Sequence, residues 1–188
     1  MKQISLIVAT LTIIGIIAGG SLSLVNNWAA PKIALNLKAE TERAIFLVHP
    51  DGKRYEEIKN AGLEVYKVFN EKDSSVGYSL VYDGNGFQGN IKLMIGLTND
   101  LNRTTSIEIL EQSETPGLGT KILEAPYKDQ FNGLEVNPSI ILVKGAEPSN
   151  PNEVQSITGA TISSKAVVAI VNEGITKLKD IENKGASE

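Results

Sequence analysis

The stretch VGYSLVYDGNGFQGNIKLMIGL, residues 76–97, decides the fold. Apolar residues alternate with polar or small residues over 76–82 and again over 91–97, which is the period of a β-strand that buries one face. Asp83-Gly84-Asn85-Gly86 lies between the two runs and is a strong turn signal. We therefore predict a β-hairpin whose turn is at residues 83–86.

The segments on either side of this hairpin supply the rest of a folded domain. Residues 63–69, 104–110 and 140–143 have the patterns of strands, and residues 125–131 have that of a short helix. A longer helix is predicted from residue 162 to about residue 181. Its buried stripe consists of Val167, Val168, Ile170, Val171, Ile175, Leu178 and Ile181. The predicted fold class is α+β, a mostly antiparallel sheet with packed helices.

The N-terminal region has the properties of a membrane span. No residue between Lys2 and Lys32 is charged, and residues 4–25 are almost continuously apolar. As a helix, this run would measure about 33 Å, enough for a hydrocarbon layer of about 30 Å. A cleaved signal peptide is the alternative, but its apolar region usually runs only about 7–15 residues. We therefore predict a retained transmembrane anchor at residues 1–30, with Trp28 at the membrane interface.

The anchor leads into the folded domain through a second helical run. Residues 33–48 mix apolar and charged side chains, and we predict a helix that leaves the membrane and ends at His49-Pro50-Asp51-Gly52. The folded domain is expected to span residues 31–182, and residues 183–188 are expected to form a polar C-terminal tail.

Two features of the anchor leave alternatives open. Gly15 and Gly19 lie four positions apart, which favours either a partner helix or simply the usual composition of membrane helices. Lysines flank both ends of the span, at Lys2 and Lys32. Charge by itself therefore does not indicate the side of the membrane on which the domain lies.

Composition excludes several classes of function. The chain has no cysteine, so disulfides, thiolate catalysis, Fe–S clusters and Cys-ligated zinc are excluded within it. Its net charge is −4 without a clustered basic run, which argues against a nucleic-acid partner. His49 is the only histidine, and its turn-like surroundings predict a surface loop residue rather than a metal ligand or a base. We predict no metal site, and redox chemistry in this chain would need a bound cofactor.

A loop of small and hydroxylated residues precedes the last helix. It contains Thr158, Gly159, Ala160, Thr161, Ser163 and Ser164. The N-terminus of the following helix offers free backbone N–H groups and a partial positive charge, which suits a phosphate group. The alternative is an ordinary Thr or Ser helix cap.

A second glycine-containing loop follows the strand at 104–110. It contains Glu114, Thr115, Pro116, Gly117, Leu118 and Gly119. The prolyl-glycyl pair and the second glycine indicate a tight loop whose amides could face a planar ligand, with Leu118 as an apolar tip between two glycines. A plain turn at the end of the strand is the alternative.

Together these segments resemble a known family. Thr158-Gly159-Ala160-Thr161 resembles the acceptor motif of FMN-binding domains that a flavin transferase modifies. Glu114-Thr115-Pro116-Gly117-Leu118-Gly119 is similar to the second signature of the G subunit of Rnf electron transport complexes, shared with the C subunit of the Na⁺-translocating NADH:quinone reductase. Residues 86–91, GFQGNI, resemble that family's Gly-Tyr-Gly-Gly-Pro-Ile segment. Gln155 stands where the acceptor motif commonly has an acidic residue.

The resemblance implies a site and a cofactor. Thr161 would bear FMN through a phosphoester, attached by a flavin transferase that uses FAD, so this residue would be an acceptor and no catalytic residue is expected in this chain. Thr158 or Ser164 would stabilise the phosphate. The flavin ring would be lined by Thr115, Gly117, Leu118 and Gly119.

The resemblance also implies a function. The chain would relay electrons within a membrane complex that couples ferredoxin and NAD chemistry to Na⁺ or H⁺ transport, with its domain outside the cytoplasm and other membrane subunits as partners. NAD would bind elsewhere, because we expect no dinucleotide-binding fingerprint of the Gly-x-Gly-x-x-Gly type in this chain. Three alternatives are the quinone reductase subunit, an anchored flavin sensor, and a ligand-binding module without flavin.

Overall fold

The computed structural model describes residues 2–58 and 62–185. The chain divides into two compact units, Met1–Glu40 and Thr41–Glu188. Residues 186–188 of the predicted C-terminal tail lie outside the described residues.

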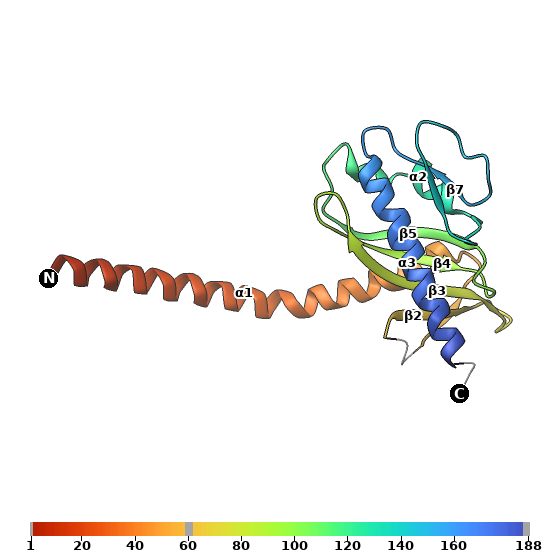
Figure 1. Cartoon of the computed structure of the whole chain (residues 1–188). Helices are drawn as coiled ribbons and strands as arrows, with labels where there is room; N and C mark the ends of the chain where they lie inside the picture. Colours follow the sequence, from red (N-terminus) through yellow and green to blue (C-terminus); the bar gives the residue numbers. More distant parts are fainter. Residues whose placement is uncertain (1, 59–61, 186–188) are drawn as a thin grey trace. The chain divides into compact units, whose positions relative to one another are not determined.

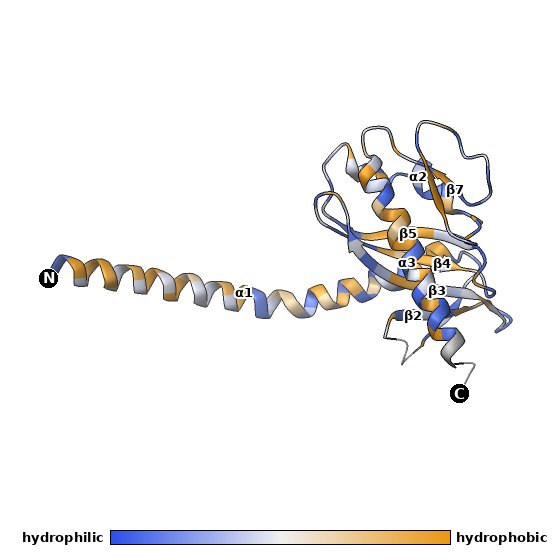
Figure 2. Cartoon of the chain, in the orientation of Figure 1, coloured by the Kyte–Doolittle hydropathy of each residue, from blue (hydrophilic) through white to orange (hydrophobic). Residues whose placement is uncertain are grey.

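The first unit is a single helical segment, the larger part of α1 (Lys2–Val48). An 18-residue window of α1 has a mean hydropathy of 2.1 and is entirely exposed, so the helix is long and apolar enough to cross a membrane. In Figure 2 the ribbon of the N-terminal part of α1 carries mainly hydrophobic colours. The hydroxyls of Thr10 and Thr12 donate to the carbonyls of Leu6 and Val8, at 2.9 and 2.8 Å, so neither would be unpaired in hydrocarbon.

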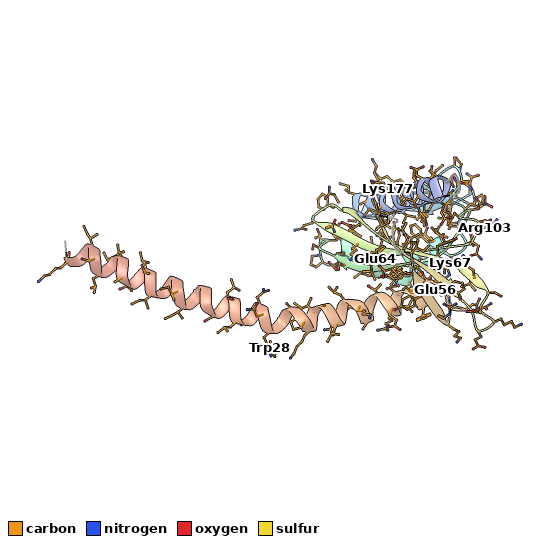
Figure 3. The ribbon with its side chains drawn as sticks, turned by 90° about the horizontal axis from the view of Figure 1, so that it is seen from below. Trp28, Glu56, Glu64, Lys67, Arg103 and Lys177 are labelled. Atoms are coloured by element: carbon orange, nitrogen blue, oxygen red, sulfur yellow. The ribbon has the colours of Figure 1, made fainter. Side chains whose placement is uncertain are left out.

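The helix does not stop at Pro31, which lies inside α1. The two predicted helical runs, 4–25 and 33–48, are therefore one element. Close to this proline, the Lys32 ammonium lies 3.7 Å from the centroid of the Trp28 ring, and Figure 3 shows Trp28 projecting from the helix. An aromatic ring with a cationic partner suits a membrane–water boundary.

The second unit is built on a five-stranded antiparallel sheet in the order β1-β2-β3-β4-β5. The strands are β1 (Arg54–Glu57), β2 (Glu64–Phe69), β3 (Ser75–Asn85), β4 (Asn90–Leu97) and β5 (Thr104–Gln112). The antiparallel sheet confirms the predicted fold class. β1 was not predicted, because its residues are polar and largely exposed at the sheet edge.

The hairpin is confirmed, but its predicted turn is wrong by three residues. β3 continues through Asn85, which pairs with Asn90, and the N–H of Gly86 donates to the carbonyl of Gly89 at 2.7 Å. Gly84 does not turn the chain. A Cβ at this position would lie 2.8 Å from Cγ1 of Ile170, so this glycine allows close approach of the C-terminal helix.

The same hairpin contains a Gly-x-Gly-x-x-Gly spacing, which we did not expect in this chain. Gly84, Gly86 and Gly89 do have the spacing Gly-x-Gly-x-x-Gly. They lie where one antiparallel strand turns into the next, whereas a dinucleotide-binding motif joins a parallel strand to a helix whose N-terminus faces the phosphates. The spacing in this chain is therefore that of a hairpin turn.

The remaining elements follow β5. They are η1 (Gly119–Leu123), α2 (Ala125–Lys128), η2 (Asp129–Phe131), β6 (Ile141–Val143), β7 (Glu153–Gln155) and α3 (Thr161–Gly185). β6 and β7 form a separate parallel pair. Figure 1 shows α3 crossing the sheet over β3, β4 and β5, and Figure 3 shows it, with Lys177, on one face. The predicted last helix is confirmed and continues to Gly185.

Apolar side chains fill both faces of the sheet. Between the sheet and α3 lies the larger cluster, which includes Leu80, Ile95, Phe131, Val171 and Leu178. On the opposite face, Val68, Val81 and Met94 are covered by Ala44, Ile45 and Val48 from the last turns of α1.

His49 contradicts its prediction. It is 3% exposed rather than a surface loop residue, and its Nε2 lies 3.0 Å from the Tyr78 carbonyl. Burial lowers the pKa of His49, although the bond to Tyr78 opposes that shift. The ring packs against Gly77, where a Cβ would lie 2.7 Å from Cε1 of His49. The buried turns of α1 therefore carry this histidine inward.

Candidate functional site

The two glycine-containing loops meet, although they lie far apart in the sequence. A Cβ on Gly159 would lie 3.4 Å from Cδ2 of Leu118. A Cβ on Gly119 would lie 3.0 Å from Oγ of Ser163. Both glycines therefore allow the loops to approach closely.

Between these loops lies a cleft of about 410 Å³. It is lined by Phe87, Thr115, Leu118, Gly119, Lys144, Gly159, Ala160, Thr161, Ile162 and Ser163. Seven predicted site residues are in this lining: Thr115, Leu118, Gly119, Gly159, Ala160, Thr161 and Ser163. Four predicted residues are not in it: Glu114, Gly117, Thr158 and Ser164.

The acceptor loop presents Thr161 as the first residue of α3. Gly159 has φ +83°, a left-handed conformation that glycine adopts at low cost, and the following N–H of Ala160 donates to Ile157 O at 3.0 Å. The half-buried Thr161 makes no side-chain hydrogen bond to another described residue. Its hydroxyl is thus free for a ligand at a helix end whose first amides lack intrahelical partners.

Ser164 holds this loop from inside. Its hydroxyl accepts from the N–H of Ile157 and donates to the carbonyl of Ala160, both at 3.0 Å, and its side chain is fully buried. Tyr127 donates to the Ser164 carbonyl at 3.0 Å. Ser164 therefore shapes the loop instead of facing the cleft.

Thr158 lies on the other side of the acceptor loop. It is exposed and borders a second hollow of about 260 Å³ together with Lys121 and Gln155. Gln155 is fixed in β7, where its N–H donates to Oε1 of Gln130 at 2.7 Å.

The second loop presents Leu118 to the cleft. Gly117 has φ +75°, and its N–H donates to Oγ1 of Thr120 at 2.9 Å, while the N–H of Leu118 donates to Thr115 O at 3.2 Å. These bonds close a tight turn and leave Leu118 48% exposed. The predicted apolar tip is therefore confirmed.

Glu114 lies beneath the cleft. It is 4% exposed, and its carboxylate accepts from the Ser163 hydroxyl and from the N–H groups of Phe87 and Gln88, the last two at 2.8 and 3.0 Å. Burial by itself would raise the pKa of Glu114, but these hydrogen bonds outweigh it and hold the pKa below its usual range. Glu114 therefore stays ionised near neutral pH.

Three cleft residues have no counterpart in the sequence prediction: Phe87, Lys144 and Ile162. Phe87 was quoted only as part of a resembling segment, and Lys144 follows β6 without any local signal. Phe87 and Ile162 are 60% and 58% exposed, so with Leu118 they give the cleft an apolar rim. Such a rim beside a helix N-terminus suits a flat apolar ring that carries an anionic group.

The His, Asp and Glu side chains of the described residues are scattered. No group of three or more His, Asp or Glu side chains that could hold a metal ion occurs among residues 2–58 and 62–185. The charges at the cleft are instead the Lys144 ammonium, the positive end of α3 and the buried Glu114 carboxylate.

Comparison with known proteins agrees with this geometry. Residues 86–176 match the family described as FMN-binding domain, and that segment holds both glycine-containing loops and the β3–β4 turn. By this match the segment is an FMN-binding domain, and the chain is similar over longer stretches to G subunits of ion-translocating oxidoreductase complexes. It is 29% identical over 182 residues to the G subunit of the ion-translocating oxidoreductase complex of Methanosarcina acetivorans, a match that covers 93% of this chain and 94% of that protein.

Other relatives are matched over shorter lengths. The chain is 38% identical over 114 residues to the G subunit of the Na⁺-translocating ferredoxin:NAD⁺ oxidoreductase complex of Acetobacterium woodii, covering 60% of this chain and 54% of that protein. The solved structure of the C subunit of the Na⁺-translocating NADH-quinone reductase from Parabacteroides distasonis aligns with a TM-score of 0.62 at 18% identity. That alignment covers 79% of this chain and 94% of that structure, and at this identity it concerns the fold alone.

Proposed function

We propose that this protein is the electron-carrier subunit of a membrane-bound, ion-translocating ferredoxin:NAD oxidoreductase complex of the Rnf type, with FMN in phosphoester linkage to Thr161. One observation carries the proposal. The Thr161 hydroxyl, without a hydrogen-bond partner among the described residues, lies at a helix N-terminus in a cleft with an apolar rim. The match along nearly the full length of an Rnf-type G subunit supports the type of complex.

The residues of the cleft fit FMN. Leu118, Phe87 and Ile162 offer apolar surface for the flavin ring, and glycines at 119 and 159 leave room for its approach. The first amides of α3 can donate to the phosphate oxygens, and the Lys144 ammonium adds a positive charge at the same cleft. When bound, FMN supplies the one-electron chemistry that these side chains lack.

Thr161 serves as an acceptor in maturation. Its oxygen forms the bond to the FMN phosphorus of FAD, the pyrophosphate bond breaks, AMP leaves, and the hydroxyl proton passes to a base of the flavin transferase. Covalent attachment suits a domain outside the cytoplasm, where a dissociated cofactor would be lost to the medium. Helix α1 would anchor the domain beside the other membrane subunits.

The C subunit of a quinone reductase is the second candidate, since the chain is 28% identical over 134 residues to that protein of Vibrio alginolyticus. That match covers 52% of the Vibrio protein, against 94% for the G subunit of Methanosarcina. The relative lengths therefore favour the Rnf type. Affinity purification from the native membrane would distinguish these two candidates by the subunits that co-purify. The partners of an Rnf-type subunit would accept electrons from ferredoxin, and those of a quinone reductase subunit would pass electrons to quinone.

Mass spectrometry tests the attachment site. We expect intact protein from the native membrane to exceed its sequence mass by one FMN less one water, with the excess on the peptide that contains Thr161. Thr161→Ala should fold and lose this excess. Thr176→Ala, an exposed position on the same helix, should keep it. Retention of phosphoester-linked FMN by Thr161→Ala, or an unmodified wild-type protein from a source with an active transferase, would contradict the assignment.

A further inference from the structure

One carboxylate joins all three loops that border the cleft. Glu114 belongs to the second loop, accepts from Ser163 at the start of α3, and accepts from the amides of Phe87 and Gln88 in the β3–β4 turn. None of these donors is charged, and no ion pair of Glu114 occurs among the described residues.

Close packing holds this carboxylate in place. A Cβ on Gly86 would overlap Oε1 of Glu114, and a Cβ on Gly119 would lie 2.8 Å from Oε2. Both oxygens are thus enclosed by backbone that only glycine permits. Glu114 cannot swing into the cleft without breaking its hydrogen bonds, so it acts on a ligand through its neighbours and through its charge.

We infer that Glu114 is a positioning residue whose buried negative charge lowers the reduction potential of the flavin held in the cleft. This inference rests on the proposed function. Ser163 and Gly119 line the cleft and both contact Glu114, so these two residues lie between the charge and the cleft. Reduction adds electrons to the ring, and a nearby anion in a poorly solvated site disfavours that addition.

Two substitutions separate the charge from the shape of the site. Glu114→Gln keeps the side-chain size and one oxygen acceptor for the Phe87 and Gln88 amides, but removes the negative charge. Ser163→Ala keeps the charge and removes one donor that partly offsets it. Glu111→Gln is the matched control: this residue is exposed on β5, the strand that leads into the loop of Glu114, and water screens its carboxylate.

Spectroelectrochemical titration of the FMN-loaded proteins tests the inference at one pH and one ionic strength. We expect a more positive midpoint potential for Glu114→Gln, a more negative one for Ser163→Ala and no change for Glu111→Gln. A wild-type or more negative potential in Glu114→Gln would overturn the inference. If Glu114→Gln does not fold or does not bind FMN, the test rests on Ser163→Ala. An unchanged or more positive midpoint potential in Ser163→Ala would then overturn the inference.

The same samples distinguish this inference from the proposed function. Absence of FMN from the wild-type protein would appear in its intact mass before any potential is measured, and it would contradict the proposed function. FMN-loaded variants with unchanged potentials would contradict the role of Glu114 alone.

Discussion

His49 illustrates how one residue can be misjudged from its sequence neighbours. Pro50, Asp51 and Gly52 indicate a turn, yet the imidazole is buried and bonded to the Tyr78 carbonyl. Thr105 donates to the adjacent Val48 carbonyl at 2.6 Å, so two side chain–backbone bonds fasten this helix end to the sheet. The turn itself is present, with the Gly52 N–H donating to His49 O at 2.9 Å.

The burial of His49 predicts a pH dependence of stability. Its folded pKa is lowered, so the unfolded chain binds a proton more readily than the folded one. The contribution of neutral, buried His49 to the free energy of unfolding is therefore complete above the ordinary histidine pKa of about 6.5. It is lost as the pH falls through the lowered pKa that His49 has in the folded protein. We expect a loss of up to about 1.4 kcal/mol per pH unit in the free energy of unfolding over that interval.

Urea unfolding of the wild-type protein and His49→Gln at pH 7.5, 6.5 and 5.5 measures this effect. No other histidine occurs in the sequence, so the variant should show a smaller slope in this range. Lowered pKa values of carboxylates such as Glu114 affect stability only at lower pH, where those groups take up protons. Equal slopes of the free energy of unfolding against pH in the two proteins would show that His49 does not cause the pH dependence.

At the scale of the element, the start of α3 depends on a buried hydroxyl that faces away from the cleft. Ser164 connects Ile157 with Ala160 across the bend at Gly159 and so fixes the direction in which Thr161 projects. The Glu114 carboxylate acts in the same way on the β3–β4 turn, because it pairs the amides of Phe87 and Gln88.

Ser164→Ala should weaken this element. The Ile157 N–H would lose its partner, and an unpaired buried donor costs about 1–3 kcal/mol. Thr176→Ala, an exposed hydroxyl that bonds one turn back on the same helix, should change the free energy of unfolding by no more than about 0.5 kcal/mol. Chemical unfolding of both variants checks the difference, and equal losses would mean that the Ser164 bonds contribute no more than a surface hydroxyl.

At the scale of the whole molecule, the boundary between anchor and domain lies inside one helix. Residues 2–40 of α1 belong to the first unit, and the last turns of the same helix belong to the core of the second. Ala44, Ile45 and Val48 cover the sheet face that α3 leaves free. The helix that carries the apolar N-terminal run thus also supplies part of the hydrophobic core of the folded domain.

Two truncated proteins test this boundary. A chain that begins at Thr41 should fold cooperatively, whereas one that begins at Pro50 should lose about 1.5–3 kcal/mol for each of the buried Ile45 and Val48 side chains. It would also expose Val68, Val81 and Met94, and the total is comparable with the stability of a small domain. Circular dichroism melting of both chains is the measurement. Equal melting temperatures would show that α1 contributes nothing to the domain.

The amino-acid sequence by itself determined the elements that depend on local pattern. Alternation over 91–97 and the long apolar run at 4–25 correspond to β4 and to the exposed part of α1. The stripe of residues 167–181 likewise corresponds to α3. Both glycine-containing loops were also recognisable, because glycine and small hydroxylated residues are selected by backbone conformation, which is a local property.

Tertiary structure decided the rest. It moved the hairpin turn to residues 86–89, buried His49, and placed Lys144 at the cleft. It also placed Glu114 beneath the cleft and turned the Ser164 hydroxyl inward. The burial of His49 and the bonds of Glu114 to the β3–β4 turn depend on partners at least 26 residues away, and Lys144 reaches the cleft only because β6 is placed beside the loops. The bonds of Ser164 are local, but their direction could not be told from the residue type alone. Burial and long-range hydrogen bonds exist only after distant segments of the chain have packed together, so a local sequence pattern does not encode them.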